Sequence, residues 1–207
     1  MPSASSTVPS PSALRRRILT EASAIVADQG VDALTVRLVA GRSGCSTIGV
    51  YTHFGDKAGL VEAVLLDAWD GFDATVSASD DEPDPVERLV RAAHAYRTWA
   101  LDHRTLYVVM FTPVVPGMVG RPAVQARGTA SLAAHRSRID RALATGALRA
   151  DDPDTLATAT WTQVHGWVMA DLLGALPLTP AATSAADDAV RPQFETSVRA
   201  LLTGFRA

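Results

Sequence analysis

The chain has 207 residues, of which 47% are hydrophobic, and a formal net charge of −3 at pH 7. These values allow a packed core and argue against a disordered chain. No run of about 18 apolar residues occurs, and the opening MPSASSTVPSPSA lacks the regions of a signal peptide, so we expect a cytoplasmic protein without membrane contact. Cys45 is the only cysteine, which excludes an internal disulfide.

Charge is unevenly divided between two parts of the chain, which we call the head (residues 1–60) and the body (residues 61–207). The head holds six Lys and Arg residues against four Asp and Glu residues, a net charge of +2. The body holds 13 against 18, a net charge of −5. We therefore expect any polyanionic partner to bind the head.

Helical periodicity recurs along the chain and strand patterns are nearly absent, so the predicted fold class is all-α. In the head, apolar residues at helical spacing predict a first helix that stops at Gly30. A short helix over about 36–42 follows, with Thr35 placed to cap it. After a turn at 43–46, Ser46 is placed to cap a third helix that ends near residue 54.

Asp56 occupies the cap position of a fourth helix, which the apolar pattern predicts to reach about residue 72. Two short helices joined by a turn of about four residues, between longer helices, is the layout of a helix-turn-helix module. The sequence therefore predicts that the head contains such a module.

The body begins with an acidic connector at 80–85 and continues as helices separated by loops rich in Pro and Gly. The helices are expected at about 85–102, 104–111, 121–145, 154–173 and 187–204. We predict a disordered N-terminal arm at 1–12, a three-helix domain with the helix-turn-helix module at 13–58, and a helical bundle at 59–207.

The third helix is too short to be stable through its own propensity, so packing must hold it and its outward face is free for contact. Apolar side chains expected to pack are Ile48, Val50 and Phe54, whereas Thr47, Tyr51, Thr52 and His53 have polar tips to spare. Gly49 lies mid-helix at a cost of up to about 1 kcal/mol relative to alanine. Close approach of a DNA backbone or base edge would explain that glycine.

From Leu34 to Leu60 the chain resembles the DNA-binding domain of the tetracycline-repressor (TetR) family. The resemblance rests on the turn, the Tyr-x-His-Phe pattern at 51–54, and the following Lys57 and Leu60. Residues 96–111 and the Trp-x-x-x-His-Gly motif at 161–166 resemble a C-terminal effector domain of one branch of that family.

This resemblance implies that Tyr51 and His53 donate hydrogen bonds to phosphate oxygens and that Lys57 pairs with another phosphate. Phenol, imidazole and ammonium groups are all donors, and helix N-termini favour anions. The alternative is that the two rings only pack the head and that Lys57 is solvated.

Base reading is less well specified, because residues 46–53 contain no Asn, Gln, Arg or Lys, the usual bidentate readers. Hydroxyls of Ser46 and Thr47 can bond bases, and threonine methyls can touch thymine methyls. Arg37 either reads a guanine or only contacts phosphate or water. The full predicted DNA-binding set is Thr35, Arg37, Ser46, Thr47, Gly49, Tyr51, Thr52, His53 and Lys57.

Catalytic and metal-binding patterns are lacking. Gly41 to Cys45 nearly spells a G-x-S-x-G nucleophile elbow, but no strand precedes it. The five histidines show no metal-ligand spacing, so we expect no catalytic residue, no metal and no cofactor. Cys45 is expected to pack in the core, and the sequence leaves a redox role for it open.

Aromatic and polarizable residues in the body predict a largely apolar small-molecule cavity, although each of them taken singly is expected to be core. The predicted ligand-binding set is Tyr96, Trp99, His103, Tyr107, Met110, Phe111, Trp161, His165 and Met169. The last helix has an apolar stripe of Phe194, Val198, Leu201 and Leu202, which predicts that the helices at about 154–173 and 187–204 pair with those of a second copy as a four-helix bundle.

Taken together, these patterns predict a homodimeric transcriptional repressor that binds a palindromic double-stranded operator and leaves it when a small apolar effector binds. The alternatives are a helical ligand-binding or interaction protein without DNA, or a helical enzyme that uses His165. Salt-dependent binding to duplex DNA separates the first reading from both.

Overall fold

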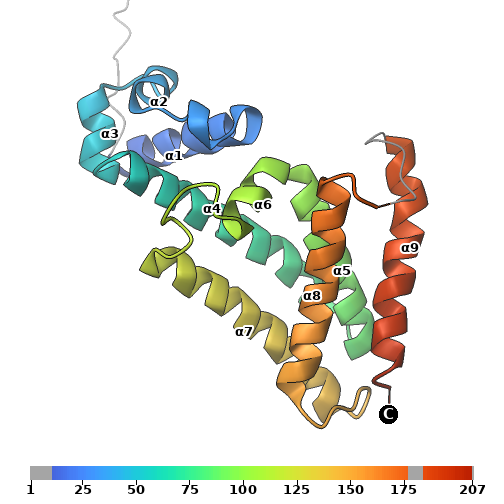
Figure 1. Cartoon of the computed structure of the whole chain (residues 1–207). Coiled ribbons are helices and arrows are strands. Elements are labelled where there is room, and N and C mark those ends of the chain that lie inside the picture. The colour runs from blue at the N-terminus through green and yellow to red at the C-terminus, as the bar shows by residue number, and fades with distance from the viewer. Residues whose placement is uncertain (1–10, 177–183, 207) are drawn as a thin grey trace, which may run out of the picture. The chain divides into compact units, whose positions relative to one another are not determined.

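The computed structural model describes residues 11–176 and 184–206 of the chain (Figure 1). These residues form helices and turns, with one isolated bridge between Leu148 and Arg206 and no strand among them, which confirms the all-α prediction. The helices are α1 (Pro11–Gln29), α2 (Val36–Arg42), α3 (Thr47–Phe54), α4 (Lys57–Ser77), α5 (Pro85–Asp102), α6 (Arg104–Phe111), α7 (Pro122–Ala144), α8 (Pro153–Leu172) and α9 (Ser184–Thr203).

Helix boundaries agree with the sequence patterns except around α4. This helix runs to Ser77, five residues past its predicted end, and a 3₁₀ turn over Ala78–Asp81 follows it. The acidic connector is therefore short, and Asp84 in it caps α5 by accepting from the amides of Val86 and Glu87 at 2.8 and 3.0 Å. The predicted arm at 1–12 falls almost wholly outside the described residues.

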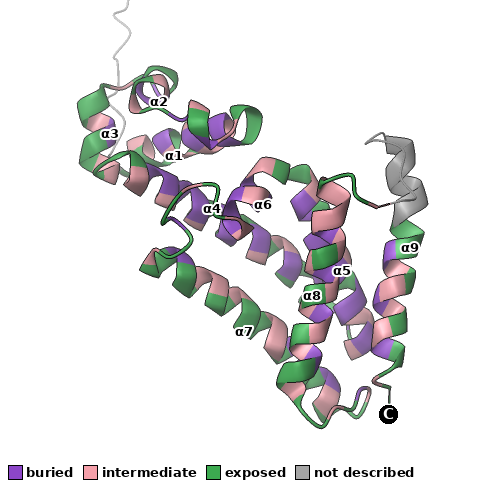
Figure 2. Cartoon of the chain, in the orientation of Figure 1, coloured by how far each residue is buried: buried purple, intermediate pink, exposed green. Residues whose placement is uncertain are grey.

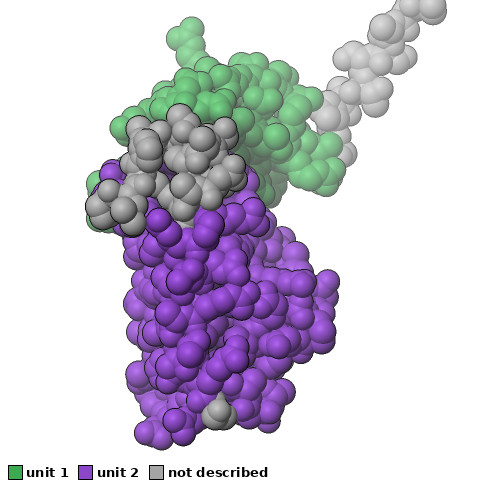
Figure 3. All heavy atoms as spheres, turned by 90° about the vertical axis from the view of Figure 1, so that its right-hand side faces the viewer, with its two compact units in different colours: residues 1–68, 105–124 green, residues 69–104, 125–207 purple. Residues whose placement is uncertain are grey.

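Two compact units make up the chain, coloured separately in Figure 3. Unit 1 comprises residues 1–68 and 105–124, and unit 2 comprises residues 69–104 and 125–207. The domain boundaries expected from the sequence, 13–58 and 59–207, stay a prediction.

In unit 1, helices α1, α2 and α3 contact one another around a small apolar core. Ile18, Ile25 and Leu34 are fully buried there. The first helix ends as predicted, because Gly30 adopts a φ of 82°, a conformation that favours glycine, and its amide donates to the Val26 carbonyl. This core holds the two short helices in place, since neither is long enough to be stable alone.

Unit 2 is built around α5, which contacts both α8 and α9 and has nine of its 18 residues buried. Figure 2 shows these buried residues alternating with more exposed ones. The apolar stripe of α9 lies in this core: Phe194, Val198 and Leu202 are buried within a single chain, and Leu201 is half-buried. The prediction that this stripe pairs with a second copy is therefore wrong in its choice of face, because α5 and α8 already cover it.

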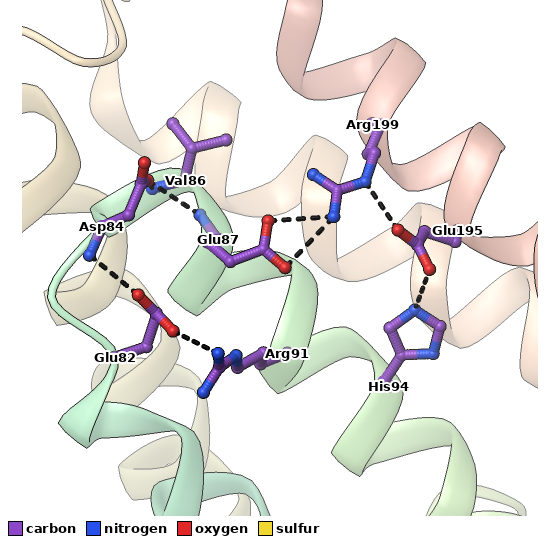
Figure 4. A network of polar contacts seen from close by, with 8 residues as sticks. All are labelled: Glu82, Asp84, Val86, Glu87, Arg91, His94, Glu195 and Arg199. Carbon is purple, nitrogen blue, oxygen red and sulfur yellow. Dashed lines mark hydrogen bonds and ion pairs between the residues drawn. The ribbon is translucent and has the colours of Figure 1, made fainter.

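Ion pairs tie the helices of unit 2 together. Arg97 of α5 contacts Asp171 of α8 at 2.7 Å, and Arg138 of α7 contacts Asp80 at 2.8 Å. Figure 4 shows a third set, in which Arg199 of α9 reaches Glu87 of α5 at 2.9 Å. These contacts link segments that lie far apart in the sequence.

Candidate functional site

Local capping fixes both short helices of the head. The Thr35 hydroxyl accepts from the Leu38 amide at 3.2 Å, and the Ser46 hydroxyl accepts from the Gly49 amide at 3.2 Å. Asp56 accepts from the Gly59 amide at 2.7 Å and so opens α4. All three predicted caps are confirmed, and each satisfies an amide that a helix start leaves without a partner.

Gly59 sets the path of the chain from α3 into α4. A Cβ at this position would lie 2.1 Å from the Phe54 carbonyl oxygen, a backbone atom that cannot swing away. Only glycine fits this approach of the two helices. Sequence reasoning missed this role, because a glycine in the first turn of a helix gives no signal of what its Cα faces.

The outward face of α3 differs from the prediction at one residue. Val50 is only 1% exposed and Phe54 is half-buried, so these two hold α3 against the core. Ile48 was expected to join them but is 74% exposed, because α1 and α2 meet the other side of the helix. Tyr51, at 51% exposed, lies one turn further along the same face.

Hydroxyl groups on this face are partly engaged. Thr52 donates to the Ile48 carbonyl at 2.8 Å, which is a contact within the helix. Ser46 uses a lone pair for capping, so its hydroxyl hydrogen is still available to a ligand. Thr47 is exposed, and His53 is half-buried with its ring edge-on to Phe54.

The cations of the head are exposed and form no ion pair within the described residues. They are Arg15, Arg16, Arg17, Arg37, Arg42 and Lys57. The Arg15 guanidinium lies over the Phe54 ring, 5.1 Å from its centroid, and this cation–π contact does not neutralise its charge. Unneutralised cations around a helix with an open donor face favour an anionic partner.

An open surface depression follows the exposed side of α2. It is lined by Thr35, Arg37, Leu38, Gly41 and Arg42. Guanidinium groups of the kind that line it can bind phosphate or a base edge. The sequence singled out Arg37 but not Arg42, which the helical turn brings to the same depression.

Part of the predicted effector set comes together in unit 2. The Tyr96 hydroxyl lies 3.1 Å from His165 Nδ1, and Trp161 stacks on the His165 ring at 5.2 Å between centroids. Burial lowers the pKa of His165, so it is neutral at pH 7. A polar pair bordered by aromatic rings is a typical anchor for a mostly apolar ligand.

Other members of that set form further ring contacts, and Trp99 and Tyr96 both pack edge-on against Phe72, with ring centroids 5.4 and 4.8 Å from its own. Trp99 stacks on His103 at 4.5 Å, and His103 Nδ1 lies 2.9 Å from the Trp99 carbonyl. Met169 is half-buried on α8. In unit 1, Tyr107 and Met110 are buried, and Tyr107 packs on Phe111 at 4.7 Å. Whether these residues share one ligand site stays a prediction.

The described residues hold neither a cluster of metal-ligating side chains nor a helix that could span a membrane. No group of three or more His, Cys, Asp or Glu side chains could hold a metal ion within residues 11–176 and 184–206. None of the helices in that part of the chain is both long and apolar enough to span a bilayer. Cys45 is half-buried beside Gly49, and so less enclosed than expected.

Two sequence families match the chain. Residues 18–64 match the family described as "Bacterial regulatory proteins, tetR family". Residues 89–193, more than half of the chain, match "Tetracyclin repressor-like, C-terminal domain". The chain belongs to the TetR family. The predicted resemblance is thereby confirmed, while the status of the Trp-x-x-x-His-Gly motif stays open.

Similar TetR-family proteins include the HTH-type transcriptional repressor KstR2 of Mycolicibacterium smegmatis, 33% identical over 102 residues. That match covers 49% of this chain and 49% of the relative, so the chain spans about half the length of this curated relative.

Solved structures resemble this TetR-family chain over nearly its whole length. A protein of unknown function from Rhodococcus sp. RHA1 has a TM-score of 0.80 at 24% identity and covers 98% of both chains. The ketosteroid transcriptional regulator KstR2 of Mycobacterium tuberculosis has a TM-score of 0.60 at 21% identity, over 93% of this chain and 95% of that one. At these identities the likeness concerns the fold.

Proposed function

We propose that this chain is a dimeric TetR-family repressor that binds a palindromic operator through α2 and α3 and releases it when a small, largely apolar molecule binds the body. The observation that carries the DNA-binding part is the set of exposed cations in the head that form no ion pair within the described residues, two of which line the depression along α2. In this proposal Tyr51, His53 and Lys57 donate to phosphates, and Thr35, Gly49 and Thr52 lie at the contact surface. Operator half-sites are then about 10 bp apart, or slightly more.

Selection of duplexes from a randomised pool by the full-length protein tests this function. A palindromic sequence should be enriched, and its affinity should fall steeply as salt is raised, because each phosphate contact releases about one counterion. The control is a variant with Arg37 and Lys57 both replaced by Met, which should retain the fold and show a shallower salt dependence, because each chain loses two cations. If the parent enriches no sequence, or binds without salt dependence, the proposed function is wrong.

For the dimer, we propose that α8 and α9 pair with their copies in a second chain through faces other than the buried stripe. On α8, Thr158, Thr162 and Gly166 are exposed at a spacing of four residues. Leu173 at the end of α8 is 72% exposed. Small side chains allow two helices to approach closely, and the exposed leucine supplies apolar area at the rim.

Gly166→Arg tests the dimer without disturbing one chain. A Cβ at Gly166 would meet no atom within 4 Å, so the longer side chain fits the isolated chain but not a close helix pair. Light scattering should give twice the chain mass of 21.8 kDa for the parent, and the mass of one chain for the variant. Ala133→Arg, at an exposed position of α7, is the matched control and should remain dimeric. A monomeric parent would overturn the dimer and the palindrome with it.

For the effector, we propose that the Tyr96–His165 pair anchors one polar atom of an otherwise apolar molecule. The name of the Mycobacterium tuberculosis neighbour makes ketosteroids a sensible first panel of probes. His165→Leu removes the polar anchor and keeps similar bulk, so operator affinity should stay within a few-fold while ligand-triggered release weakens. If the variant responds to ligand like its parent, His165 only packs in the core and does not anchor the effector.

A further inference from the structure

The outward face of α3 carries an isoleucine where a hydrogen-bonding side chain would be the usual reader of bases. Ile48 is 74% exposed, the highest value among the large hydrophobic residues that the structure describes. It lies in the first turn of the helix, between the exposed Thr47 and the half-buried Gly49. No Asn, Gln, Arg or Lys lies on this helix to form a bidentate contact with a base.

The exposure of Ile48 is not required by the packing of the head. Val50 and Phe54 supply the buried side of α3, and Ile48 adds nothing to that core. Leaving an isoleucine in water forgoes the free energy that burial of its side chain would give. An apolar side chain exposed between hydroxyl-bearing residues, on a head whose cations form no ion pair within the described residues, therefore fits a partner that is anionic overall and apolar at one point.

Duplex DNA offers such a point in its major groove. The 5-methyl group of thymine is the apolar group that a base pair presents there, and the remaining positions are donors and acceptors. The neighbouring Thr52 already spends its hydroxyl hydrogen on the Ile48 carbonyl, so it presents a methyl group and lone pairs rather than a donor. The first two turns of α3 are thus better suited to methyl contacts than to hydrogen-bond readout.

We propose that Ile48 is a specificity-determining residue that packs against the 5-methyl group of a thymine in each operator half-site. This inference rests on the proposed DNA-binding function and adds the base that α3 selects and the chemical group by which it does so. The phosphate donors Tyr51 and Lys57 orient the helix, and the isoleucine then distinguishes thymine from cytosine and from uracil, both of which lack the methyl group.

The test uses a duplex selected from a randomised pool by the full-length parent protein. Each thymine is replaced in turn by deoxyuridine, which removes only the methyl group, and binding is measured for the parent and for Ile48→Ala. For the parent, one position per half-site should lose about fourfold in affinity, the value expected for one buried methyl. For Ile48→Ala, the same replacement should change nothing, because the partner of the methyl group is already gone.

Leu132→Ala is the matched control, since Leu132 is another exposed apolar residue, 44% exposed, on α7. It should behave like the parent at every thymine, and thermal unfolding should show that both variants are folded. If no deoxyuridine weakens the parent, or if the loss is equally large in Ile48→Ala, the assignment of Ile48 is wrong while the DNA-binding function stands. If no duplex is selected at all, the proposed DNA-binding function is wrong, and the assignment of Ile48, which rests on it, is wrong as well.

Discussion

Arginine serves different purposes in the head and in the body of this protein. In the body, arginines of α5, α7 and α9 reach carboxylates on neighbouring helices, as Arg97 does with Asp171 and Arg199 with Glu87. In the head, five arginines and one lysine are exposed, and none of them pairs with a carboxylate in the described residues. The same side chain therefore stabilises the fold in one region and remains available in the other.

This difference explains why the net charge of the whole chain does not describe the charge that the head presents. The whole chain is acidic, at −3, but the acidic residues of the body are largely engaged by its own arginines. What an anion meets is the local supply of unpaired cations, which the head provides. The predictions below test whether that separation of roles holds.

The largest effect is expected from a matched pair of substitutions, Arg97→Met and Arg37→Met. Arg97 and Asp171 are both largely buried. Removing Arg97 leaves the Asp171 carboxylate buried without a counter-charge, which should lower the free energy of unfolding by about 3–5 kcal/mol. Arg37 is exposed without a partner, so its loss should change stability by less than about 0.5 kcal/mol. Urea unfolding measures both, and operator binding should fall only for Arg37→Met among folded samples.

A double variant provides the control for the buried pair. Replacing Arg97 and Asp171 together by apolar residues removes the stranded charge and should recover most of the lost stability. Equal destabilisation by Arg97→Met and Arg37→Met would contradict the distinction between the two regions.

The next effect concerns pH and again distinguishes the body. Burial lowers the pKa of His135 to about 4, while its Nε2 lies 2.8 Å from the Thr160 hydroxyl. In the unfolded chain this histidine titrates near 6.5, so between those values the unfolded state binds the extra proton. Its stabilisation is complete above pH 6.5 and is lost as pH falls towards 4, by about 3 kcal/mol in all.

His135→Gln should flatten that dependence, because glutamine can replace the hydrogen bond and does not titrate. Unfolding free energies at pH 7 and pH 4 for parent and variant measure the difference. A variant with the same acid sensitivity as the parent would show that other groups carry it, such as His165, whose pKa burial also lowers.

Much of the head was predictable because its signals are local. Thr35, Ser46 and Asp56 cap helices that begin one residue later, and capping depends on a few neighbouring atoms. The Arg97–Asp171 pair could not be predicted, since its members lie 74 residues apart and nothing in either segment specifies the other. Long-range pairing is decided by tertiary packing.

In the candidate site the sequence was informative only in part. The family pattern points to Tyr51, His53 and Lys57 as DNA contacts, which stays a prediction, whereas average hydrophobicity assigns Ile48 to the core and the structure exposes it. Which side of so short a helix is buried depends on where α1 and α2 dock, and the sequence of α3 does not contain that information. For the α9 stripe the amphipathic pattern was correct, but it could not tell a neighbour in the same chain from a second copy.

A smaller effect is expected from removing one unpaired cation at the start of α4. Lys57→Met should weaken binding to all duplexes about equally and lower the slope of log affinity against log salt by about 2, because a dimer on its operator loses one phosphate contact from each chain. Lys57→Arg retains the charge and should keep the slope. A folded Lys57→Met variant with an unchanged slope would mean that Lys57 is only solvated, which would remove one member from the proposed contact surface.

The smallest effect, and the one that separates stability from binding most cleanly, is expected from Gly49→Ala. A Cβ at Gly49 would meet Ser46 and Cys45 atoms at 3.7–3.8 Å, an ordinary contact distance, so packing within the chain does not require glycine there. Alanine should therefore stabilise α3 by up to about 1 kcal/mol. If DNA approaches the helix at this point, the added methyl group should nevertheless weaken operator binding.

Gly71→Ala on α4, where a Cβ also has room at 3.6 Å, is the control and should leave binding unchanged. A Gly49→Ala variant that is more stable and binds as well as its parent would place the DNA elsewhere on the head, and the free cations alone would then have to account for binding.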